Sequence, residues 1–153
     1  MTAIQNVRLE IVENQDAAAA LVSFELQADP TDLLAGLTYV ETVELIGVDR
    51  IAGEDGRDEP IPGGRSEASV TFPPQPLVAG VPVPPAKLQR RRLLALPAAR
   101  LDEDPAAGPL IGISDADEIR ARVTLSRSSR RFSALSNTLV LHRIVAGFAS
   151  VAA

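Results

Sequence analysis

Strict alternation of apolar and polar side chains is the feature that most constrains this chain. In residues 119–125, apolar Ile, Ala, Val and Leu alternate with Arg, Arg and Thr. Successive side chains of a β-strand point to opposite faces of a sheet, so this run predicts a strand with one buried and one solvated face. Further runs of this kind cover residues 7–11, 22–26, 38–48, 68–72, 88–96 and 138–145.

The segments between these runs are rich in turn formers, and helical periodicity is nearly absent. Twelve prolines leave little room for helices. Residues 53–56 and 60–64 are expected in one long loop, and six prolines between 73 and 85 mark another. The pattern predicts an all-β fold, a two-sheet antiparallel β-sandwich of about seven to eight strands. Its expected core includes Val22, Phe24, Leu26, Val70, Ile119, Val123 and Leu125.

Length and composition place the chain in the globular class. A length of 153 residues fits a single sandwich domain over residues 1–153. The N-terminal segment lacks a basic stretch followed by an apolar run, so we expect cytoplasmic synthesis without a signal peptide. No apolar stretch approaches the roughly 18–20 residues that span a bilayer, so membrane insertion is not expected. One Lys against fourteen Arg is typical of a GC-rich bacterial genome.

The C-terminal third carries two segments with a known pattern, DADEIRARVTL (115–125) and SNTLVLHRI (136–144). They resemble the last strands of immunoglobulin and fibronectin type III modules, in which the penultimate strand alternates and the last often opens with Ser-Asn-Thr. The resemblance implies an immunoglobulin-like or related topology, in which binding and structural roles are common. This chain is longer than those modules, lacks the Cys pair and buried Trp of immunoglobulins, and has Arg122 near the place of a corner Tyr.

Catalytic residues are scarce. The chain has no Cys, so a thiol nucleophile is excluded, and its only imidazole is His142. His142 lies within an expected strand, where we interpret it as a structural residue. Ser129, Ser133 and Ser136 lack the G-x-S-x-G pattern of a nucleophile elbow, and no phosphate-binding Gly motif appears. The sequence therefore predicts a protein that is not an enzyme.

Charge is distributed unevenly along the chain. Residues 1–67 contain fourteen acidic and four basic side chains, whereas residues 68–153 contain six acidic and eleven basic ones. Two Arg groups stand out, at 90–92 and at 127–131, and alternation places Arg91 on the opposite face from Arg90 and Arg92. We interpret these arginines as solvated side chains that pair with the acidic half, or as contacts to a protein partner. Nucleic-acid binding is not expected, because the chain is acidic overall and aromatics are missing beside both groups.

Clustered carboxylates raise the possibility of a metal site. Calcium takes six to eight oxygen ligands, which the loops at one end of a sandwich can supply. The candidate ligands are Asp102, Asp104, Asp115, Asp117 and Glu118, with Glu103 between the first two. No EF-hand spacing is present, and acidic loops also serve simply as solvated surface. Calcium therefore stays one of three interpretations of these residues, beside solvated loops and an interaction surface.

An apolar segment, residues 146–153, forms the C-terminal tail and must pack on its own sandwich, on another copy or on another subunit. Together with the charge asymmetry, this tail favours a non-catalytic structural or interaction module. Such a module would self-associate or bind a protein partner, as a homo-oligomer or a subunit of a larger bacterial or phage-like assembly. The alternative is a ligand-binding β-sandwich, with or without calcium, that recognises carbohydrate or peptide. The shortage of Trp and Tyr stands against sugar binding, because Tyr39 is the only candidate stacking platform outside the Phe residues.

Overall fold

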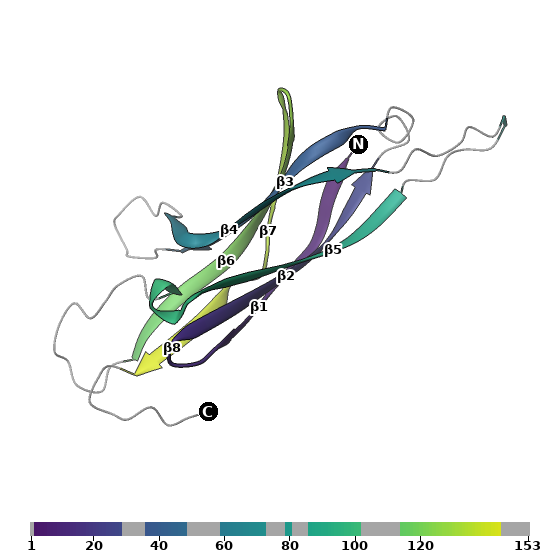
Figure 1. Cartoon of the computed structure of the whole chain (residues 1–153). Helices are drawn as coiled ribbons and strands as arrows, with labels where there is room; N and C mark the ends of the chain where they lie inside the picture. Colours follow the sequence, from purple (N-terminus) through teal and green to yellow (C-terminus); the bar gives the residue numbers. More distant parts are fainter. Residues whose placement is uncertain are drawn as a thin grey trace, which may run out of the picture.

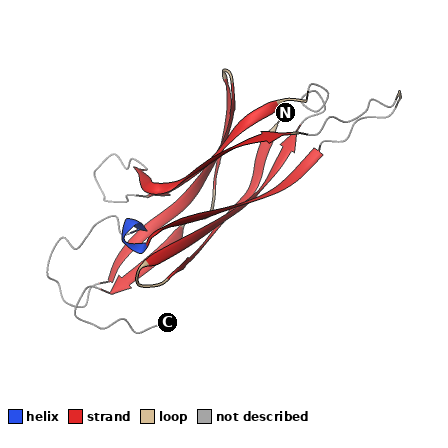
Figure 2. Cartoon of the chain, viewed as in Figure 1, coloured by secondary structure: helices blue, strands red, loops and turns tan. Residues whose placement is uncertain are grey.

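The computed structural model is an all-β sandwich of two antiparallel sheets (Figures 1 and 2). It describes residues 2–28, 36–48, 59–72, 79–80, 86–101 and 114–144, and for residues 114–117 and 142–144 it describes the backbone alone. The predicted fold class is confirmed, and eight strands lie within these ranges. The C-terminal tail, residues 146–153, lies outside them.

Sheet A contains three strands in the order β1-β2-β5. Their bounds are Ala3–Glu13 for β1, Ala17–Ala28 for β2 and Ala86–Pro97 for β5. A bulge in β1 falls between Gln5 and Arg8, where Asn6 has a φ of 54°, and it shifts the register so that Leu9 pairs with Val22. After Pro97 the chain forms a short 3₁₀ turn, η1, over Ala98–Leu101.

Sheet B contains five strands, in the order β4-β3-β6-β7 with β8 also paired to β6. The bounds are Thr38–Gly47 for β3, Glu59–Thr71 for β4, Ser114–Arg127 for β6, Arg130–Leu135 for β7 and Leu139–Ile144 for β8. β7 pairs with the second half of β6 and β8 with its first half. Ser128, with a φ of 50°, begins the two-residue turn from β6 to β7, which projects at the top of Figure 1.

The core lies between the two sheets and consists of the apolar sets that alternation predicts. All seven expected core residues are buried, from Val70 at 4% exposure to Val123 at none. Tyr39 packs edge-on against Phe72 and Phe132, with ring centroids 6.0 and 6.4 Å away. The position of Tyr39 inside the core makes it unavailable as a surface platform for a sugar.

The expectation of a loop over residues 60–64 is wrong, because these residues belong to β4. β4 lies at the edge of sheet B, where Pro60 is tolerated since one side of the strand needs no ladder hydrogen bonds. The pairing with β3 shifts between Glu44 and Ile46. At Gly64 a Cβ would stand 3.1 Å from Leu45 Cβ, so glycine lets the irregular stretch approach the core.

The crossing from β7 to β8 also ties sheet B to sheet A. Ser136 bonds to Ala121, with its N 2.9 Å from the carbonyl O and its Oγ 2.8 Å from the amide N. Asn137 reaches the edge strand β1, where its Oδ1 accepts from Leu9 N at 2.9 Å and its Nδ2 donates to Leu9 O at 3.4 Å. The side chain of Asn137 thus completes the backbone hydrogen bonds of Leu9 as a neighbouring strand would.

Candidate functional site

The residues proposed as calcium ligands are only partly described. Asp102 and Asp104 lie outside the described residues, as does Glu103. The backbones of Asp115, Asp117 and Glu118 lie in β6, where they pair with β8. No group of three or more potential metal-ligating side chains occurs within the part of the chain that the structure describes. The calcium site stays a prediction.

The structure shows in which strand or turn each candidate catalytic residue lies. His142 lies in β8 and pairs with Ala116 of β6. Of the three serines, Ser133 is in β7, Ser136 is in the crossing and Ser129 is in the β6–β7 turn rather than in a strand. Ser136 Oγ accepts from Ala121 N and donates to Asn137 O at 2.7 Å, so it is engaged in a structural role.

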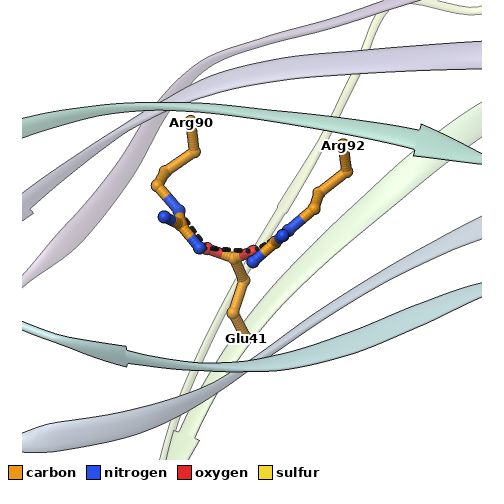
Figure 3. A network of polar contacts seen from close by, with 3 residues as sticks. All are labelled: Glu41, Arg90 and Arg92. Atoms are coloured by element: carbon orange, nitrogen blue, oxygen red, sulfur yellow. Dashed lines mark hydrogen bonds and ion pairs between the residues drawn. The ribbon is translucent and has the colours of Figure 1, made fainter.

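An ionic triad lies between the two sheets (Figure 3). Arg90 and Arg92 share the inward face of β5 with Leu88 and Leu94, and Glu41 occupies the inward face of β3. Arg90 donates through Nε to Glu41 Oε2 at 2.8 Å and through Nη2 to Oε1 at 3.3 Å. Arg92 Nε lies 2.5 Å from Glu41 Oε1. Both carboxylate oxygens are therefore used.

The triad corrects one part of the interpretation of the Arg90–Arg92 group, namely that these side chains are solvated. The side chain of Glu41 is 1% exposed, and those of Arg90 and Arg92 are 27% and 26% exposed. Their acidic partner does come from the first half of the chain, as expected, but the pairing is internal. Arg91, on the outer face, is exposed. A carboxylate removed from water needs both guanidinium groups, so the triad is a structural link between the sheets.

The outer face of sheet A is divided into two halves of different chemistry. One half is polar and includes Arg8, Arg91 and Gln89. The other, which we name the apolar half of sheet A, consists of Val12, Ala17, Ala19, Leu21, Leu93, Ala95 and Pro97. In it Val12 is 75% and Leu93 66% exposed. This face therefore exposes two large aliphatic side chains to water.

The outer face of sheet B is hollowed. A depression of about 230 Å³, which we name the sheet B depression, is lined by Thr42, Glu44, Arg65, Glu67, Thr124, Ser126 and Arg131. Three short hydroxyl side chains on the central strands β3 and β6 form its floor: Thr42, Thr124 and Ser126. Longer side chains surround this floor, namely Glu44 on β3, Arg65 and Glu67 on β4 and Arg131 on β7.

Both surfaces were missed by sequence reasoning, although alternation holds a signal for each. Leu93 and Ala95 have the opposite parity to Leu94 and Leu96, which indicates apolar residues on both faces of β5. For the sheet B depression, the signal is the hydroxyl set Thr42, Thr124 and Ser126 at outward positions. The sequence does not give the register between neighbouring strands, and this register places the residues of each surface side by side.

Comparisons with known proteins give no relative: the chain matches no protein-family model, no curated protein and no solved structure. The helices within the described ranges include none long and apolar enough to cross a membrane. The inference about function therefore depends on the surfaces described above.

Proposed function

We propose that this chain is a non-catalytic interaction module that pairs with a second copy of itself through the apolar half of sheet A. The observation that carries the proposal is the exposure of Val12 and Leu93 on one sheet face, together with Leu21 and Ala95. Burying such side chains against a matching surface removes apolar area from water. A single His and no Cys in the sequence agree with a role that needs no catalysis.

Charges beside the apolar half favour a second copy as the occupant. On the outer face, Glu10 of β1 lies in register with Leu21 and forms an ion pair with Arg8 at 3.2 Å, while Arg91 of β5 lies in register with Ser23. When two copies pair face to face with β1 of one over β5 of the other, Glu10 of each copy comes near Arg91 of the other. A two-fold interface of this kind uses the same patch twice. Charge complementarity of this sort fixes the orientation of the pair.

The area of the apolar half of sheet A determines how strong the pairing of two copies is expected to be. Three strands about 4.8 Å apart and about five residues long cover roughly 250 Å² per copy. This is below the about 800 Å² per partner of a standard stable interface. We therefore expect a weak, reversible pairing that many contacts in a larger assembly would reinforce.

The strand order supports the resemblance to immunoglobulin-like modules in part. In constant-type immunoglobulin domains the first, second and fifth strands share one sheet, and the third, sixth and seventh share the other. β1, β2 and β5 against β3, β6 and β7 follow this division. β4 differs, because it pairs with β3 and not with β5. A related topology agrees with a binding or structural role but does not select one.

A single cysteine in this Cys-free chain gives the test. Ala95→Cys places a solvent-sensitive fluorophore in the apolar half of sheet A, and Ser69→Cys places the same label at an exposed position on the outer face of sheet B. We expect the emission of the Ala95 label to shift to the blue as protein concentration rises, while the Ser69 label stays constant. The proposal would be overturned if the emission of the label at position 95 did not change with protein concentration, or if the emission shifted equally at both positions.

A further inference from the structure

The sheet B depression lies on the opposite side of the sandwich from the apolar half of sheet A, and its chemistry differs. Its floor is formed by Thr42, Thr124 and Ser126 on adjacent strands, with Thr42 paired to Thr124. Hydroxyl groups donate and accept hydrogen bonds, so such a floor suits a ligand rich in oxygen atoms. The volume of about 230 Å³ is below the roughly 300–1,000 Å³ of sites for drug-sized molecules, so the ligand is small.

Most charges in the depression cancel in pairs. Glu44 Oε1 lies 2.7 Å from Arg122 Nε and 2.6 Å from Arg122 Nη2. Arg65 Nη2 lies 3.5 Å from Glu67 Oε2. Both pairs are electrically neutral, and each leaves carboxylate oxygen available as an acceptor.

Arg131 is the exception among the lining residues. Its guanidinium has no ion-pair partner among the residues described, and it stands on β7 at the margin of the depression, beside Ser126. Arg127 on β6 belongs to the next pair of the ladder, so it has the opposite parity to Ser126 and is not a lining residue. A guanidinium presents its N–H groups as a planar fork that matches the two oxygens of a carboxylate or the oxygens of a phosphate.

We propose that the sheet B depression binds a small hydroxyl-bearing oxyanion, such as a sugar acid. The acid group pairs with Arg131, and the hydroxyl groups of the ligand exchange hydrogen bonds with Ser126, Thr124 and Thr42. Glu44 and Glu67 accept from the hydroxyls at the far side. Binding of this kind uses polar contacts in place of aromatic stacking, which agrees with the burial of Tyr39 in the core.

Titration of the ¹⁵N-labelled full chain with glucuronate, followed by amide chemical shifts, tests this site. Two further probes separate the sources of recognition: glucose carries the hydroxyls without the anion, and inorganic phosphate carries the anion without the sugar. We expect glucuronate to shift the amides of residues 122–135 and of Thr42 at lower concentration than either of the other probes. Equal affinity for glucose would overturn the role of the anion, and equal affinity for phosphate would overturn the role of the hydroxyls.

Two variants with the same change of charge complete the test. Arg131→Gln removes the guanidinium of the depression, whereas Arg127→Gln removes one from the neighbouring strand, outside the lining set. We expect Arg131→Gln to weaken glucuronate binding about tenfold to a hundredfold, the contribution of a charge-assisted hydrogen bond. Arg127→Gln should change it by less than about threefold. Equal loss in both variants would show general attraction to a basic hairpin and overturn the site, as would the absence of any shift at millimolar glucuronate.

Discussion

Arg90 of sheet A and Glu41 of sheet B face each other across the interior of the sandwich, with Arg90 Nε 2.8 Å from Glu41 Oε2. Arg92 completes the contact through the other carboxylate oxygen. The side chain of Glu41 is almost completely removed from water, so the two guanidinium groups replace its hydration. An ion pair in this position fixes how β5 lies over β3, because a shift of either strand by one residue would turn a charge toward the apolar core.

Removing the carboxylate charge of Glu41 should destabilise the fold strongly. Glu41→Gln keeps the shape of the side chain but leaves two half-buried guanidinium groups without a counter-charge, which costs about 3–5 kcal/mol. Urea unfolding followed by circular dichroism measures the loss. Glu67→Gln, which removes half of an exposed pair, is the control and should cost less than about 1 kcal/mol. Similar losses in the two variants would show that the triad has no special role.

The bridge from Asn137 to β1 should hold the edge of sheet A closed. Asn137→Ala removes the acceptor of Leu9 N and the donor to Leu9 O, at a cost of about 1–3 kcal/mol for the unsatisfied groups. We expect faster hydrogen exchange of the Leu9 amide. Asn137→Asp retains an acceptor for Leu9 N and should keep most of the protection of that amide. Unchanged exchange in Asn137→Ala would contradict the bridge.

A charge placed in the core should unfold the domain. Val123 is fully buried on β6, where an unpaired carboxylate costs several kcal/mol, comparable to the whole stability of a small domain. Val123→Asp should therefore lose its cooperative thermal transition. Ser133→Asp, an exposed change on the neighbouring strand β7, should retain the transition. A cooperatively folded Val123→Asp variant would be incompatible with the core assignment.

Calcium binding by the acidic residues Asp102, Asp104, Asp115, Asp117 and Glu118 has a direct thermal test. A cation that binds only the folded chain raises the melting temperature by mass action. If the site exists, melting curves with millimolar calcium should lie above those with chelator. Superimposable curves would leave these carboxylates as solvated surface.

The fold was predictable because alternation marks each well-buried strand. β7 was missed, since it is a short, largely exposed strand with few apolar side chains. The sequence predicts part of β4 as a loop, because Pro60, Gly63 and Gly64 are typical of turns, and an edge strand tolerates proline where a central strand does not. Edge strands show weak alternation of apolar and polar residues. They pair with one neighbour only and are partly exposed, so a wider range of residues is tolerated in them.

The ionic triad could be read from the sequence only in part. Arg90 and Arg92 have the same parity as Leu94, and Glu41 has the same parity as Val43. Opposite charges at core-facing positions of two strands are the signal of an internal pair. The charge of these three side chains alone would predict that they are exposed to solvent. Their pairing across the sheets depends on how β5 lies over β3, and no local sequence pattern gives that arrangement.

Self-association through the apolar half of sheet A is tested most directly by the mass of the full-length chain in solution. Leu93→Glu replaces a large exposed aliphatic side chain of this surface with a charge, and it should leave the melting temperature nearly unchanged because Leu93 is 66% exposed. In sedimentation equilibrium, the wild-type chain should rise from the monomer toward the dimer mass with increasing concentration, while Leu93→Glu remains at the monomer mass. A wild-type chain that stays monomeric at the highest concentrations, or a Leu93→Glu variant that associates equally well, would contradict the proposed function.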